Sequence, residues 1–385
     1  GQSNAITSYG LNDISAPFAV GNIGDIVCNL SVTPILSALV TGFTDASNVS
    51  LSADIFTALN QRYVAYTKRG FLVAYIDSIN SYVLARSFNI ANGNPLGAVF
   101  GVCTAGTCSN PVAVSDEAGN AIIFYRYGTT IYVKKVSATG TLLWAHPAND
   151  DFDTGITVLA GYTIVQALPD RASGGVGGAY LLADNGSGTI ALCRVNGTTG
   201  AVTWTQTFTG IDPHMAIDTN ATGVNRVIIA YLGTHAGASG GTYRHVRAIA
   251  YNPDNSVNFG PTDVTGSGAA IEYHCENPRI SIADTAAAES LFYISWFDGR
   301  YINYIGYSIY AQQFSNAGVA QWAGAVFIGS PTSWGYDNAL LLDLLFFDDD
   351  AGTAPFGITP IWLDYRAGNT DIYYDRRYDT GAKFP

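Results

Sequence analysis

The stretch PRISIADTAAAESLFYISWFDGRYINYIGYSIYAQQFSNAGVAQWAGAVFIG, residues 278–329, decides the fold of this chain. It holds four short apolar runs, at 280–283, 291–297, 308–314 and 321–328, each rich in β-branched or aromatic residues and bounded by Asp, Gly, Asn or Pro. Runs of this length, separated by turn residues, predict four β-strands. The same unit recurs along the chain, so it predicts the architecture of the whole.

The recurring feature is an apolar run that ends in Asp and is followed by two further apolar runs. It is found at Asp54, Asp116, Asp170, Asp218, Asp284 and Asp343. Spacings of 48–66 residues match the length of a four-stranded propeller blade. We interpret the repeated Asp as a turn residue whose carboxylate caps backbone N–H groups. A ring of calcium sites is the alternative, but no D-x-D-x-D-G loop accompanies it.

We therefore expect an all-β chain, a single β-propeller domain over residues 1–385. The clear blades are predicted at 53–109, 110–161, 162–210, 211–276, 277–336 and 337–385. Residues 1–52 are expected to supply a partial seventh blade and the strand that closes the ring, although six blades remain an alternative. A linear solenoid would need capping repeats, which the sequence does not show.

Four pieces of the C-terminal part resemble a repeat of secreted bacterial β-propellers. They are W-F-D-G-R (296–300), S-I-Y-A-Q-Q-F (308–314), G-V-A-Q-W (318–322) and W-L-D-Y-R-A-G-N-T-D-I-Y-Y-D-R-R (362–377). The repeat runs approximately W-x-D-x-R-x-G-x-x-D-I-Y-x-Q-R-x-x-x-x-G-x-x-x-W. The resemblance implies the fold and export from the cell. It implies no catalytic residue, because such repeats carry no single function.

Charge and apolar patterning exclude some classes of partner. The chain has 18 basic and 30 acidic residues, a net charge of −12, and no basic run. Nucleic acids and anionic membranes need clustered positive charge, so neither is an expected partner. No apolar run reaches the roughly 18 residues of a membrane helix. The chain opens at Gly1 without Met, which we interpret as a processed N-terminus of an extracellular protein.

The five cysteines divide into a close pair and three isolated residues. Cys103 and Cys108 flank turn residues in GVCTAGTCSNP, which predicts a local disulfide, with two free thiols as the alternative. Cys28, Cys193 and Cys275 cannot be paired from the sequence. Five N-x-S/T sequons are present, and they matter only in a glycosylating organism.

Three of the five histidines precede first strands of successive units. His146, His214 and His274 fall in segments predicted to be loops that enter the first strand. If those loops converge, three imidazoles and a nearby carboxylate could hold Zn, Mn or Cu. The alternative is that each histidine is bonded locally. The sequence therefore allows a divalent metal, Ca, Zn or Mn, without requiring one.

The same loops offer candidates for acid–base chemistry. A polysaccharide lyase would use a histidine as base, with Arg279 or Arg300 to neutralise the uronate. A glycoside hydrolase would need two carboxylates, for which Asp212 and Glu276 are the candidates. No G-x-S-x-G, H-E-x-x-H or P-loop motif is present.

Aromatic and polar residues around the best unit suit a carbohydrate ligand. The candidate binding residues are Tyr301, Tyr304, Tyr307, Trp334, Tyr336, Asp298 and Arg300. Aromatic faces stack on sugar C–H surfaces, and charged groups bind hydroxyls. The alternative is that the aromatics cover the seam between blades. Trp296, Trp322 and Trp362 fall at repeat-equivalent positions, so we expect them in the core.

Three functions remain open. The favoured one is a secreted or cell-surface binding or adhesive module, lectin-like and non-catalytic, that recognises a glycan or a surface protein. The second is an extracellular polysaccharide-degrading enzyme, a lyase before a hydrolase. The third is a structural subunit of a surface assembly, because low charge and high Gly and Tyr content suit a protein that buries its surface by self-assembly.

Overall fold

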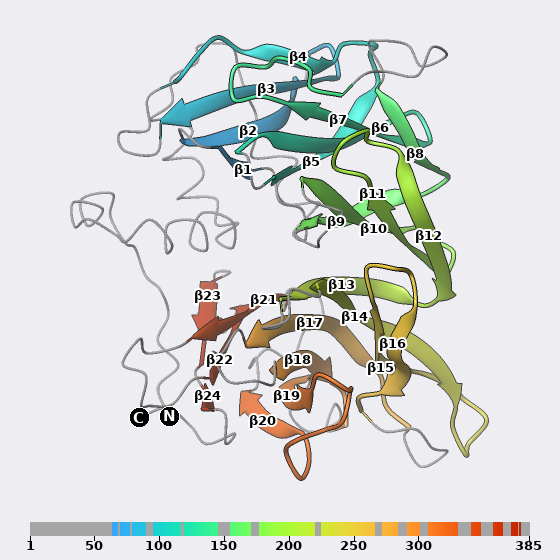
Figure 1. Cartoon of the computed structure of the whole chain (residues 1–385). Coiled ribbons are helices and arrows are strands. Elements are labelled where there is room, and N and C mark those ends of the chain that lie inside the picture. Colours follow the sequence, from blue (N-terminus) through green and yellow to red (C-terminus); the bar gives the residue numbers. More distant parts are fainter. Residues whose placement is uncertain are drawn as a thin grey trace. The chain divides into compact units, whose positions relative to one another are not determined.

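The chain folds into β-strands throughout the part that can be described. The computed structural model describes residues 64–67, 70–77, 79–89, 95–116, 119–144, 155–170, 177–219, 225–265, 272–283, 291–300, 307–329, 340–347, 357–364, 371–375 and 377–378. Every regular element in these ranges is a strand. The strands form two compact units, β1–β12 and β13–β24 (Figure 1). In the same ranges, no helix is long and apolar enough to cross a membrane.

The first unit contains three antiparallel sheets of four strands. In each, consecutive strands of the chain lie side by side. The strands are β1 (Val64–Thr67), β2 (Gly70–Asp77), β3 (Tyr82–Asn89), β4 (Phe100–Cys103); β5 (Cys108–Ser115), β6 (Ala121–Tyr127), β7 (Thr130–Val136), β8 (Ile156–Ala160); and β9 (Thr163–Asp170), β10 (Gly178–Asp184), β11 (Thr189–Val195), β12 (Val202–Thr209).

The second unit repeats this organisation in three further sheets. In the last of them, both β23 and the short β24 pair with β22. The strands are β13 (Ile211–Thr219), β14 (Asn225–Ala236), β15 (Thr242–Tyr251), β16 (Val257–Asp263); β17 (Cys275–Ala283), β18 (Leu291–Asp298), β19 (Ser308–Ser315), β20 (Val326–Gly329); and β21 (Leu340–Phe347), β22 (Gly357–Asp364), β23 (Asp371–Tyr374), β24 (Arg377–Tyr378).

Repeated four-stranded antiparallel sheets confirm the all-β prediction and its propeller-like unit. The four strands predicted within 278–329 are β17–β20, although β17 begins earlier and β20 begins later than predicted. The number of blades, their boundaries and the closure of a ring stay predictions. Residues 1–52, assigned to the closing strand, lie outside the described residues.

Apolar side chains fill the space between neighbouring sheets within each unit. In the second unit, Phe292 stacks between Phe259 and Phe314, with ring centroids 5.6 and 5.1 Å apart. Three residues from three strands of two sheets thus form one aromatic layer, the packing that aromatic pairs favour. Trp296 and Trp362 are fully buried, which confirms their predicted core role. Trp322 is half-buried and lies outside β20.

The repeated Asp at the end of a first strand forms ion pairs. Asp116 accepts a hydrogen bond from the backbone N–H of Asn120 at 2.7 Å, which confirms the predicted cap, and also pairs with Lys135 at 2.9 Å. Two other members of the repeat pair with arginines of their own sheets, in Asp170–Arg194 and Asp218–Arg226. Breaking a buried pair leaves an uncompensated charge, so loss of one partner should destabilise these three sheets.

Two members of that predicted repeat were assigned wrongly. Asp343 lies in the middle of β21 and not at its end, because the sequence LLLDLLFF continues the strand beyond it. The strand that pairs with β2 is β1, Val64–Thr67, and not the run that ends at Asp54. Asp54 and Asp284 lie outside the described residues.

Three first strands share a β-bulge built on an Asn-Pro or Asp-Pro pair. The pairing register shifts at Asn110–Pro111 in β5, at Asp212–Pro213 in β13 and at Asn277–Pro278 in β17. The residue before each proline has a positive φ of 49–50°, a conformation that Asn and Asp tolerate better than other non-glycine residues. Proline lacks an N–H donor, so it is compatible with a strand at a bulge or a sheet edge. The first strand of each sheet is such an edge.

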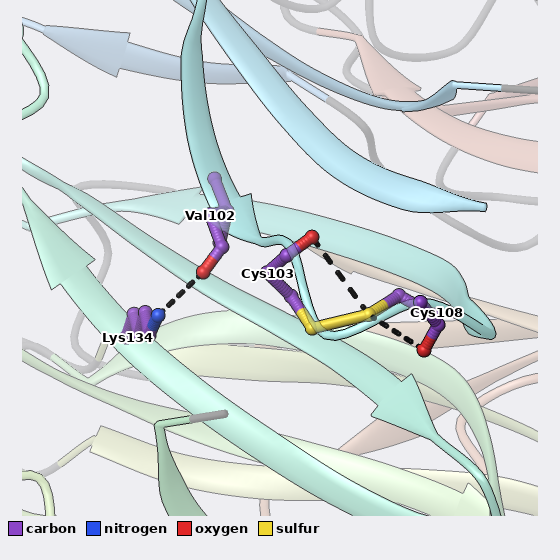
Figure 2. Close-up of a disulfide and its surroundings, with 5 residues drawn as sticks. Val102, Cys103, Cys108 and Lys134 are labelled. Carbon is purple, nitrogen blue, oxygen red and sulfur yellow. Dashed lines mark hydrogen bonds between the residues drawn. A yellow bond between two sulfur atoms is a disulfide. The ribbon is translucent and has the colours of Figure 1, made fainter. Parts of the chain in front are cut away.

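The predicted disulfide is present in the first unit. Cys103 and Cys108 are bonded, and beside them the Lys134 ammonium donates to the Val102 carbonyl at 2.5 Å (Figure 2). This contact ties β7 to the end of β4, so two neighbouring sheets are joined there by a covalent bond and a charged hydrogen bond. Cys193 and Cys275 are buried thiols. Cys28 lies outside the described residues.

The left-handed backbone at the bulges gives a direct stability prediction. Asn277→Val should lower the free energy of unfolding by about 1–2 kcal/mol, because a β-branched residue is strained at positive φ. Asn277→Gly should change it much less, because glycine has no Cβ. Urea unfolding of both variants measures this. Equal losses in the two would contradict a backbone origin.

Candidate functional site

A row of polar residues crosses the first strands of the second unit. The register places His214 of β13 opposite Ala230, Arg279 of β17 opposite Ser295, and Asp343 of β21 opposite Ile361, each directly after a register shift. β13 packs beside β17, and β17 beside β21. The row therefore follows three neighbouring strands at one level.

In the first unit, the position after the bulge of β5 is apolar, whereas the position after the register shift in β9 holds the buried, uncharged Gln166. In β5 it is Val112, which pairs opposite Phe124 after the same kind of bulge and is fully buried in the core. Valine fills this site without burying charge, so packing alone does not call for His, Arg or Asp there. The row in β13, β17 and β21 places ionisable side chains where β5 has a valine and β9 an uncharged amide, and it is our candidate functional site.

Arg279 is the member of the row whose charge is almost fully buried. Its side chain is 1% exposed, its guanidinium lies 3.8 Å from the Asp212 carboxylate, and it donates to the carbonyl of Pro278 at 2.8 Å. Burial lowers the pKa of Arg279, whereas the carboxylates of Asp212 and Asp343 act in the opposite direction. Burying a guanidinium is costly unless it is paired, so Asp212 and Asp343 compensate a charge that an apolar side chain would not bring.

His214 lies inside β13, which makes its predicted loop position wrong. It is buried, and its Nδ1 accepts a hydrogen bond from the Ile280 N–H of β17 at 3.4 Å. The strand extends to Ile211 because the bulge at Asp212 absorbs the proline that had suggested a loop. Glu276, also predicted to be in a loop, lies in β17 for the same reason.

Glu276 is held at the start of β17 by the β14–β15 hairpin. Arg244 donates to its carboxylate at 2.6 Å, and the Arg244 N–H donates to His274 Nδ1 at 3.2 Å. These contacts place the hairpin between the second and third strands on the same face as the start of the next first strand. Asp212 and Glu276, the two candidate carboxylates, thus each have an arginine partner, and their side chains are 29% and 30% exposed.

A second group of histidines, which sequence reasoning missed, lies on this hairpin. His235 Nδ1 is 3.0 Å from His245 Nδ1, and His245 Nε2 is 2.9 Å from Asp263. Burial lowers the pKa of His245, and Asp263 partly offsets this. Tyr243 lies between this pair and His274, with ring centroids 6.0 Å from His235 and 5.4 Å from His274.

Asp298 and Arg300 make their contacts within their own sheet. Asp298 is fully buried and accepts from Trp296 Nε1 at 3.0 Å and from Arg300 Nε and a terminal nitrogen at 2.8 Å. The guanidinium stacks over Tyr310, 4.2 Å from the ring centroid. The W-x-D-x-R signature is thus a framework in which each polar group has a partner, and a ligand role for this pair stays a prediction.

Only some of the remaining predicted site residues lie among the described residues. His146, Tyr301, Tyr304, Trp334 and Tyr336 lie outside the described residues. The ring of Tyr307 packs 6.3 Å from that of Phe297. Among the described residues, no group of three or more His, Cys, Asp or Glu side chains could hold a metal ion. His214 and His274 bond to different backbone N–H groups, of Ile280 and Arg244, and the three-histidine metal site stays a prediction.

A pocket of about 250 Å³ lies in the first unit, lined in part by Asp116, Lys135 and Trp144. The Lys135 ammonium contacts Asp116 and the carbonyls of Gly177 and Gly197 at 2.9–3.1 Å. Trp144 is almost fully buried and donates to Gly197 at 2.9 Å. These polar groups bond to one another, so the pocket joins two sheets and gives no sign of a ligand.

No protein-family model and no curated protein matches the chain. The solved structures that resemble this chain do so only distantly. A periplasmic gluconolactonase of Pseudomonas aeruginosa is 10% identical with a TM-score of 0.40, over 84% of this chain and 86% of that one. The Dos1 propeller is 10% identical with a TM-score of 0.39, over 80% and 71%. An α-L-arabinanase of Penicillium chrysogenum is 9% identical with a TM-score of 0.37, over 70% and 93%. Similarity this distant says nothing about a substrate.

The framework assignment of Asp298 can be tested by stability. Asp298→Ala should lower the free energy of unfolding by about 3 kcal/mol, because it leaves Arg300 and the Trp296 N–H without their partner. Asp254→Ala, in the exposed turn before β16, is the matched control and should have little effect. Thermal and urea unfolding measure both. A stable Asp298→Ala variant would contradict the framework role.

Proposed function

We propose that this chain is an exported β-propeller that binds glycans without catalysis. In this proposal the propeller has seven blades, residues 1–52 complete the ring, and the binding surface is the end of the second unit where β13 and β17 begin. The repeated four-stranded sheets support the fold. The Cys103–Cys108 disulfide supports export, because disulfides persist in oxidising compartments.

One observation carries the choice of ligand. Asp212 and Glu276 present partly exposed carboxylates at the same end of neighbouring strands, and each is held by an arginine. Carboxylate oxygens accept hydrogen bonds from several donors at once, so each can accept from a sugar hydroxyl while its arginine stays bound. Two fixed acceptors on adjacent strands suit a ligand that carries many hydroxyl donors.

The surroundings of these carboxylates also suit a sugar. The β14–β15 hairpin brings Tyr243 and His274 beside Arg244, with the two rings 5.4 Å apart. Aromatic and imidazole faces can contact sugar C–H surfaces while charged groups bind the hydroxyls. The net charge of −12 favours neutral glycans over strongly anionic ones.

A glycan array followed by calorimetric titration tests the proposal. We expect at least one neutral or weakly charged glycan to bind. Asp212→Asn and Glu276→Gln should each weaken it by about tenfold or more, because a hydrogen bond to a charged group contributes about 1.5–3 kcal/mol. Asp254→Asn, a conservative change of an exposed Asp distant in the sheet from these strand starts, should bind as the wild type does.

Two results would overturn the proposal. One is the absence of binding to every glycan on a broad array. The other is binding that neither Asp212→Asn nor Glu276→Gln changes. Depolymerisation of a polysaccharide by the wild type would instead identify the chain as an enzyme and contradict the non-catalytic part. An assay of reducing ends and of unsaturated uronate absorbance on the same glycans measures this.

A further inference from the structure

The β14–β15 hairpin brings two histidine side chains together through their Nδ1 atoms. His235 and His245 are ten positions apart in the sequence but 3.0 Å apart at Nδ1, with ring centroids separated by 4.9 Å. The pairing register explains this: His235 lies opposite Tyr243 and Gly233 opposite His245. The two histidines are therefore diagonal neighbours, within reach of one another across two paired strands.

The tautomers of His235 and His245 follow from a carboxylate that lies beside His245. Asp263 of β16 approaches His245 Nε2 at 2.9 Å, and a carboxylate only accepts hydrogen bonds. Nε2 therefore carries the proton, and Nδ1 of the neutral ring offers its lone pair. His235 Nδ1–H must then donate to His245 Nδ1. The His235 Nδ1 proton therefore lies between the Nδ1 atoms of His235 and His245, which point toward one another.

We propose that His235 and His245 bind a divalent transition-metal ion of the zinc and copper class through their Nδ1 atoms, while the proton on His235 Nδ1 moves to Nε2 of the same ring through solvent. In a tetrahedral zinc site with metal–nitrogen bonds of about 2.0–2.1 Å, two nitrogens are about 3.3 Å apart. The observed separation of 3.0 Å is within a few tenths of an ångström of this. Small rotations of two rings would seat the ion.

Asp263 supplies the outer support that such sites use. Histidines that ligate metals usually donate their other ring N–H to a carboxylate, which fixes the tautomer and orients the ring. Asp263 occupies that place for His245, and Arg247 Nε holds the same carboxylate oxygen at 2.9 Å. This order of ligand, carboxylate and arginine exists before any ion binds.

Gly233 provides the space for this arrangement. A Cβ atom at Gly233 would lie 2.6 Å from Cδ of Arg247 and 3.5 Å from Cε1 of His245. Any larger residue would therefore displace the arginine that holds Asp263. Glycine at this strand position, which weakens a strand in general, is explained by the close approach of these two side chains.

The site differs from the three-histidine site considered above and is more open. Two protein nitrogens leave the other coordination positions to water or to a ligand, in keeping with the absence of any larger cluster of His, Cys, Asp or Glu among the described residues. Imidazole ligands favour Cu²⁺ over Zn²⁺ in affinity, and hard cations such as Ca²⁺ favour oxygen ligands. Because both ligands are neutral imidazoles before and after binding, no net proton should leave the two rings.

Calorimetric titration of the tag-free full chain with Cu²⁺ and with Zn²⁺, separately, tests the proposal. We expect one tight equivalent, with Cu²⁺ bound more tightly than Zn²⁺ and Ca²⁺ not bound at this site. His235→Gln and His245→Gln should each remove that equivalent. Asp263→Asn should weaken it by about 10- to 100-fold, the usual effect of losing an outer partner. Electron paramagnetic resonance of the Cu²⁺ form should show two imidazole nitrogens.

His274→Gln is the matched control, since His274 lies on the same face and is not a proposed ligand; it should keep the wild-type affinity. His235 is half-exposed, so His235→Gln should fold even if the buried His245→Gln does not. Unchanged Cu²⁺ affinity in His235→Gln would overturn the proposal, as would a tight equivalent lost on His274→Gln alone. Titration in two buffers of different ionisation enthalpy tests that no net proton leaves the rings.

Discussion

A proline-containing bulge at the edge of a sheet is the constraint that sets the candidate site in β13 and β17. The first strand of each sheet pairs on one side only, so a residue without an N–H donor can be placed there at little cost. In β13 and β17 the residue before that proline, Asp212 or Asn277, takes a left-handed backbone, and the register shifts. The shift sets which side chains of the following segment face the neighbouring first strand.

Burying the polar row costs free energy that apolar side chains at the same positions would not cost. Val112 occupies the equivalent position of β5 within the core, which shows that the repeat can fill this level with an apolar side chain. The second unit instead buries Arg279 and compensates it with Asp212 and Asp343. Buried ion pairs seldom stabilise a protein more than apolar residues of the same volume. A buried ionisable row at this position therefore agrees with the binding role proposed above.

The strands and the disulfide could be predicted from the sequence, whereas the site could be predicted only in part. Apolar runs between turn residues located β17–β20, and the spacing of Cys103 and Cys108 predicted their bond. The bulges lie at sequence pairs that can be recognised, namely Asn110–Pro111, Asp212–Pro213 and Asn277–Pro278. Proline next to Asp or Asn is also typical of loops, so the sequence predicted loops there. No sequence signal marked the His235–His245 contact, because it depends on the register of a long hairpin, which composition does not determine.

Arg279→Met distinguishes a binding role of the polar row from a stabilising one when unfolding and glycan affinity are measured on the same preparation. Methionine fills a similar volume, and Asp212 remains 29% exposed and can be solvated. If the row serves binding, we expect a free energy of unfolding within about 1 kcal/mol of the wild type or above it. Glycan binding should be lost, because Asp212 is no longer held. A variant that loses several kcal/mol of stability but still binds the glycan when folded would contradict a binding role.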